Sequence, residues 1–138
     1  MNREDFQQLA EIRLREARTL LNARNFDGAY YLAGYAVECA LKACIAKLTQ
    51  QHDFPPERKF IEDCYSHEID KLLRASGLTA QRDADATANP LFGKNWQLVK
   101  DRNEKARYLR WSNKAAKRLI KAIANKSNGV MQWIRIHW

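Results

Sequence analysis

The chain has 138 residues, enough for one domain with its own hydrophobic core and too few for two domains of ordinary size. Five Gly and three Pro leave few positions for turns, so the composition favours long helices. The net charge of +8 is unevenly placed, because residues 94–126 hold eleven Lys or Arg against two acidic residues. We therefore expect a single domain, residues 1–138, with a local excess of positive charge.

The hydropathy pattern argues against a membrane protein or a secreted one. The longest uncharged run in the apolar part of the chain, residues 29–37, ends at Glu38 and falls well short of the ~20 residues of a membrane span. The first five residues are largely charged and lack the apolar segment of a signal peptide. We expect a cytoplasmic protein without membrane association.

The cysteines are three in number and have neither CxxC spacing nor a nearby His cluster; they are Cys39, Cys44 and Cys64. An odd count in this pattern does not suggest a disulfide framework or a zinc site. We interpret them as reduced thiols that pack in the core, and the sequence predicts no metal or cofactor.

Two long helices are predicted in the first third of the chain. Apolar residues recur at three and four positions from about Arg3 to Ala23, which is the period of an amphipathic helix. Asp27 stands where it could cap a second helix from about Gly28 to Gln50. That helix is apolar on nearly every face and should lie at the centre of the fold or at a subunit interface. Its small residues would let another helix approach closely: Ala33, Gly34, Ala36, Ala40 and Ala43.

Shorter elements follow a connection at residues 52–56. A short helix is expected over 56–63, and Ser66 should cap a helix from about His67 to Ala75. Gly77 provides a left-handed stop after it. Residues 78–90 are small and polar, and they predict a mobile loop with one helical turn at most.

The last third begins with an apolar stretch over residues 91–99 and a basic stretch that runs through Trp111. Ser112 is the expected cap of a helix that continues to about Asn125 and is ended by Gly129. Residues 130–138 are too apolar to remain exposed to solvent and should pack on the rest of the domain as a short helix. Since no strand pattern competes, the predicted fold class is all-α.

The basic segment is the clearest candidate for a binding surface. From Lys114 to Lys121, four basic residues fall at i, i+3, i+4 and i+7, so they form one stripe on a helix. Such a stripe attracts a polyanion by releasing counterions, and aromatic residues beside it, Tyr108 and Trp111, could stack on unpaired bases. The alternative is a solvated face that raises solubility. The candidate nucleic-acid-binding residues are Lys105, Arg110, Lys114, Lys117, Arg118 and Lys121.

Glu38 and Lys42 are four residues apart on the apolar second helix, at the spacing where Glu and Lys side chains meet. One interpretation is structural: the two charges neutralise each other or hold a partner helix in register. The other places them in a polar cleft that orients a nucleotide. Tyr31 and Tyr35 would add hydroxyl groups to that cleft, although Tyr at helical spacing is also common in cores.

His67 is the candidate general base. In the first turn of its predicted helix, the positive end of the dipole would favour a neutral imidazole, which can accept a proton. No second catalytic group stands at a helpful spacing, so the alternative is a packing or capping role.

Three segments, taken together, have the pattern of a known family. Residues 30–43 read YYLAGYAVECALKA, in which aromatic and small residues lead into Val-Glu and then Leu-Lys-Ala. Residues 66–73 read SHEIDKLL, and the last segment joins Asn95-Trp96 to EKARY at 104–108 and to Trp111. In this order, and from about residue 6 to the C-terminus, the chain resembles the HEPN family (higher eukaryotes and prokaryotes nucleotide-binding domain).

The resemblance implies an up-and-down bundle of four to five helices with a short C-terminal helix, commonly a homodimer. Many members pair with a small nucleotidyltransferase, and others are metal-independent endoribonucleases that use an Arg and a His separated by four to six residues. No Arg stands five to seven positions before His52, His67 or His137, so that catalytic pair is not carried over. Arg107 lies in the segment resembling the family's Arg-Tyr segment, which implies either a place in the polar cleft or a structural tie to Glu38 or the C-terminus.

Three hypotheses follow. The leading one is a non-enzymatic module, homodimeric through its apolar helices, that binds RNA, a nucleotide or an anionic partner protein along its basic surface. The second is an atypical metal-independent endoribonuclease that uses His67 with Arg or Lys from a neighbouring helix or subunit. The third is a structural partner of a nucleotidyltransferase in a toxin–antitoxin-type system.

Overall fold

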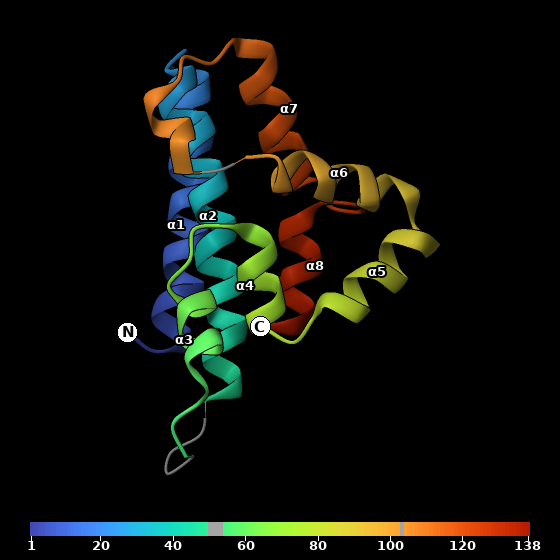
Figure 1. Cartoon of the computed structure of the whole chain (residues 1–138). Coiled ribbons are helices and arrows are strands. Elements are labelled where there is room, and N and C mark those ends of the chain that lie inside the picture. Colours follow the sequence, from blue (N-terminus) through green and yellow to red (C-terminus); the bar gives the residue numbers. More distant parts are fainter. Residues whose placement is uncertain (50–53, 103) are drawn as a thin grey trace.

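The computed structural model describes residues 1–49, 54–102 and 104–138, and these residues form helices without any strand (Figure 1). The long helices α1 (Arg3–Asn22) and α2 (Phe26–Leu48) form an antiparallel pair along one side of the bundle. The remaining helices are α3 (Arg58–Cys64), α4 (Ile69–Ala75), α5 (Thr79–Ala88), α6 (Pro90–Lys100), the 3-10 helix η1 (Glu104–Tyr108), α7 (Asn113–Ala124) and α8 (Val130–His137). The predicted all-α bundle is confirmed.

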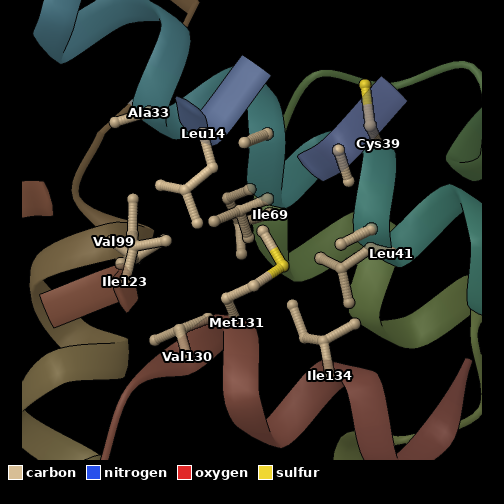
Figure 2. Packing of buried hydrophobic residues seen from close by; sticks show 14 of the residues in the cluster. Leu14, Ala33, Cys39, Leu41, Ile69, Val99, Ile123, Val130, Met131 and Ile134 are labelled. Atoms are coloured by element: carbon tan, nitrogen blue, oxygen red, sulfur yellow. The ribbon is translucent and has the colours of Figure 1, made fainter. Parts of the chain in front are cut away.

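The centre of the fold is α2, which contacts α1, α4, α7, α8 and η1. Figure 2 shows Leu41 of α2 close to Met131 and Ile134 of α8 within the core cluster, to which Leu14 of α1 and Ile69 of α4 also belong. Removal of this apolar surface from water is the main force that holds the helices together, at about 25 cal/mol per Å². The prediction of a central apolar helix is confirmed within one protomer.

Local signals set several helix ends as predicted. The hydroxyl of Ser112 accepts from the backbone N–H of Ala115, 3.1 Å away, and caps α7. Gly77 follows α4 with φ +72°. This left-handed conformation has a low steric energy for Gly, because Gly has no Cβ. The C-terminal residues dock as α8, whose inner face is buried.

The expected mobile loop over residues 78–90 is wrong, because Thr79–Ala88 form the helix α5. No residue of α5 is buried and none of its apolar residues is larger than Ala, so the large apolar residues that reveal the other helices are missing here. Tertiary contacts supply the stability instead: α5 packs beside α6, and Asp85 accepts a hydrogen bond from Nε1 of Trp133 at 2.8 Å.

Two predicted caps are also corrected. Asp27 lies inside the first turn of α2, and its carboxylate accepts from the backbone N–H of Trp111 and pairs with Nε of Arg110 at 2.7 Å. The hydroxyl of Ser66 accepts from the backbone N–H of Glu68, and α4 begins only at Ile69. His67 therefore precedes the helix, and the dipole argument made for it does not apply.

None of the described helices combines the length and hydropathy needed to cross a membrane. All three cysteines are free thiols, two of them buried, as the sequence predicted.

Candidate functional site

A buried ion pair joins the middle of α2 to the residue that follows the turn after α6. Glu38 is 1 % exposed, and its Oε1 accepts a hydrogen bond from Nη1 of Arg102, which is also buried. Nη2 of Arg102 donates to the backbone carbonyl of Tyr31 at 3.1 Å, and the guanidinium lies 5.3 Å from the centroid of the Tyr31 ring. Mutual pairing and these further contacts offset the cost of removing both charges from water.

The second carboxylate oxygen of Glu38 connects this pair to the surface. Oε2 lies 3.0 Å from Nδ1 of His67, whose side chain is 49 % exposed. A neutral imidazole that donates its Nδ1–H to a carboxylate keeps the lone pair of Nε2, and the carboxylate fixes the ring orientation. Glu38 therefore orients His67 while Arg102 holds Glu38.

Of the residues predicted for a polar cleft, Tyr31 and Arg107 lie together near the buried pair. The Arg107 guanidinium lies 4.9 Å from the centroid of the Tyr108 ring, and its pKa is raised by Tyr108 and, to a smaller extent, by a hydrogen bond with Tyr31. Arg107 is exposed and does not hold Glu38. The structural role expected for Arg107 is performed by Arg102.

Tyr35 stacks on Tyr31, with ring centroids 6.4 Å apart and planes 8° from parallel. Its hydroxyl is engaged with the Cys39 thiol, and burial raises the pKa of Tyr35. Tyr31 of the stacked pair lies against Arg102, whereas the Tyr35 hydroxyl bonds to a residue one turn further along the same helix.

Lys42 does not pair with Glu38, which corrects the structural interpretation of their spacing. Both oxygens of Glu38 are taken by Arg102 and His67. Lys42 is half-buried and lines a different pocket of about 550 Å³ with Ile45 and Phe60. A planar guanidinium forms a better buried partner for a carboxylate than the more strongly hydrated ammonium of Lys.

The basic stripe of α7 lies on the surface, as its spacing predicts. Lys114, Lys117, Arg118 and Lys121 are exposed, and we call these four residues the basic face. The opposite side of α7 is buried against the core. Within the described part of the chain, no residue of the basic face forms an ion pair.

The two other predicted nucleic-acid-binding residues stand before α7. Lys105 and Arg110 are exposed, but Arg110 pairs with Asp27. The segment is held to α2 by Trp111, which stacks on Tyr30 at 3.6 Å with planes 8° apart. Arg110 is therefore partly neutralised, and the free charge is concentrated on α7.

Two residues of the candidate sites were not predicted from the sequence. Arg102 lies in the basic stretch before Trp111, where the charge pattern alone predicts exposure, although an acid within an apolar helix signals that a buried cation must pair with it. Lys94 of α6 was not among the candidates, yet it lines a groove with Arg118 and Lys121 of α7.

His52 lies outside the described residues. No cluster of metal-ligating side chains occurs among residues 1–49, 54–102 and 104–138.

Fold and site together define an all-α bundle protein in which a buried carboxylate on the central helix is held by an Arg and a His from two other segments. The family model of the HEPN domain matches residues 4–137, so the chain belongs to the HEPN domain family. Comparisons with curated proteins and with solved structures gave no significant match.

Arg102 does not belong to an Arg–His pair with the ribonuclease spacing. The residues five to seven positions after it are Arg107, Tyr108 and Leu109, so no His stands at that spacing. His67 and Arg102 each contact one carboxylate oxygen of Glu38, but His67 comes before Arg102 in the chain and not after it.

Proposed function

We propose that this HEPN protein is a non-enzymatic module that binds single-stranded RNA along the basic face of α7. The proposal rests on one observation: four exposed cations share a helix face and have no acidic partner among the described residues. Cations neutralised within the protein release no counterions on binding, whereas unpaired ones attract a polyanion strongly.

The surface near the start of α7 favours RNA over an acidic protein. Tyr108, in η1, is 76 % exposed, and the guanidinium of Arg107 lies against its ring. An exposed aromatic ring beside cations offers a stacking platform for an unpaired base, which an acidic peptide does not require.

The test is charge reversal on the basic face. Lys117→Glu, Arg118→Glu and Lys121→Glu together should weaken the binding of a labelled single-stranded RNA. They should also reduce the slope of log K against log salt concentration by about 1 to 2, since each phosphate contact contributes roughly 0.7. Fluorescence anisotropy at several salt concentrations measures both quantities.

The matched control reverses three exposed charges elsewhere, with Arg3→Glu, Arg18→Glu and Lys59→Glu. This control variant has the same change in net charge and should retain most of the affinity for the labelled RNA. Equal weakening in both variants, or an absence of RNA binding by the wild type, would refute the proposal.

A second candidate function is endoribonuclease activity, and the contact between Glu38 and His67 favours it. A carboxylate that orients a half-exposed imidazole is an arrangement used by general bases. Labelled RNA should be cleaved by the wild type and not by His67→Ala, while circular dichroism confirms that the variant is folded. Equal cleavage by the two proteins, or none by either, dismisses His67 as a general base.

A further inference from the structure

We propose that the groove between α6 and α7, which includes Arg118 and Lys121 of the basic face, holds the RNA backbone, with a base resting on its apolar floor. This inference rests on the proposed RNA binding and names the subsite. The groove has a volume of about 680 Å³, within the range of ordinary ligand sites.

Cations from two helices line the groove. Lys94 extends from α6, and Arg118 and Lys121 extend from α7. All three are exposed, and none forms an ion pair with another described residue. A phosphodiester between the two helices can therefore be held from both sides, and an Arg can bind two phosphate oxygens at once.

The one acidic residue of the lining does not cancel this charge. Asp101 is a single carboxylate against three cations, and it accepts a hydrogen bond from Nε2 of Gln97 at 3.0 Å. The groove thus keeps a net positive charge, which attracts an anionic ligand.

The groove lining also includes apolar side chains. Leu91 is 58 % exposed, and Leu98, also in the lining, is partly buried. Isolated exposed Leu residues are common, but here an exposed and a partly buried Leu line the same groove as three cations, where a flat unpaired base could cover them. A duplex keeps its bases stacked inside, so this floor favours a single strand.

Asn128 fixes one end of the groove. Its Oδ1 accepts from Nδ2 of Asn89 at 2.8 Å, and its backbone carbonyl accepts from Nδ2 of Asn95 at 2.9 Å. These bonds join the segment after α7 to the N-cap of α6, Asn89, and to the middle of that helix. The groove is consequently formed before any ligand arrives, which reduces the entropy lost on binding.

The other half of the basic face provides an internal comparison. Lys114 and Lys117 lie on the same helix and are also exposed, but they do not line the groove. Lys126, just after α7, is exposed and also lies outside the groove lining. Two sets of three cations can therefore be compared at equal charge.

The experiment compares two triple variants. The groove variant carries Lys94→Gln, Arg118→Gln and Lys121→Gln, and the outer variant carries Lys114→Gln, Lys117→Gln and Lys126→Gln. The probe is a fluorescein-labelled oligouridylate, measured by anisotropy. Loss of three phosphate contacts should weaken binding by the groove variant about tenfold or more, and binding by the outer variant less than about threefold.

The apolar floor is tested with Leu91→Ser, an exposed position at which the fold should tolerate the change. This variant should bind oligouridylate several-fold more weakly and inorganic polyphosphate with unchanged affinity, because polyphosphate has no base. Equal loss for the two probes would overturn the base contact.

Competitors separate the kinds of partner. Single-stranded RNA should displace the probe, whereas duplex RNA and polyglutamate of the same charge should displace it poorly. Equal competition by either would overturn the assignment to single-stranded RNA. Equal losses in the two triple variants would leave the basic face as an RNA surface and overturn the groove, while a wild type that binds no RNA would overturn both.

Discussion

The guanidinium of Arg102 occupies the space that a side chain at residue 34 would need. A Cβ built on Gly34 would overlap Nε, Cδ and Cζ of Arg102. Gly within a helix costs about 1 kcal/mol relative to Ala, so its place in the middle of α2 needs a compensating contact. Gly34 stands one helical turn before Glu38, and its bare backbone lets Arg102 reach that carboxylate.

Gly34→Ala should therefore destabilise the protein by about 1 to 3 kcal/mol, although Ala is the better helix former. Urea denaturation followed by circular dichroism measures the change in free energy of unfolding. Gly28→Ala is the control, because the new methyl group would meet only the flexible end of the Leu20 side chain. A Gly34→Ala protein as stable as the wild type would show that Arg102 does not lie against α2.

The ion pair makes a distinct prediction for single and double substitutions. Arg102→Met should cost about 3 to 5 kcal/mol, because Glu38 would stay buried without its main partner. Adding Glu38→Leu should restore most of the loss, since a buried ion pair replaced by apolar side chains of similar volume is often neutral. The same urea measurement tests this, and additive losses in the double variant would argue that the two residues do not interact.

Acid should weaken the contact between α3 and α4. Asp63 accepts from Nε and Nη2 of Arg74 at 2.8 and 2.9 Å, and these bonds lower the pKa of Asp63 below its ordinary value. The unfolded chain then binds the proton more readily, so the stabilisation is present above about pH 4 and is lost as pH falls through the lowered pKa.

Asp63→Asn should be less stable than the wild type at neutral pH and should show a weaker loss of stability between about pH 5 and pH 2. Unfolding free energies measured across this range provide the check. Asp83→Asn removes an exposed carboxylate that pairs with the adjacent Arg82 and should change the pH profile little. Parallel profiles for the wild type and Asp63→Asn would contradict the lowered pKa.

The thiols should differ in their reactivity toward alkylation. Burial raises the pKa of Cys39 and of Cys44 to about 11, so few thiolates exist at neutral pH, and both side chains are covered. Cys64 is half-buried, and its pKa is also raised. With iodoacetamide, intact mass should increase first by one group at Cys64, and by two more only after denaturant is added. Rapid alkylation of all three in the native protein would contradict this burial.

Much of the fold could be predicted because its signals are local. The apolar period of α1 and α2, the Ser112 cap and the stop at Gly77 each depend on residues within a few positions of one another. The exposure of the basic face was predictable for the same reason, since spacing alone determines which residues share one side of a helix. By contrast, α5 has no buried residue and no apolar residue larger than Ala, so its sequence resembles that of a polar loop.

The sequence by itself determined that the chain is helical, that α2 is the apolar core helix and that positive charge gathers near α7. Only the tertiary structure decided that Arg102, 64 residues away, binds Glu38 in place of Lys42, one turn away. It also decided that Lys94 joins Arg118 and Lys121 at one groove. The physical reason is that periodicity fixes the direction of a side chain relative to its own helix, while the choice among distant partners depends on how the helices pack together.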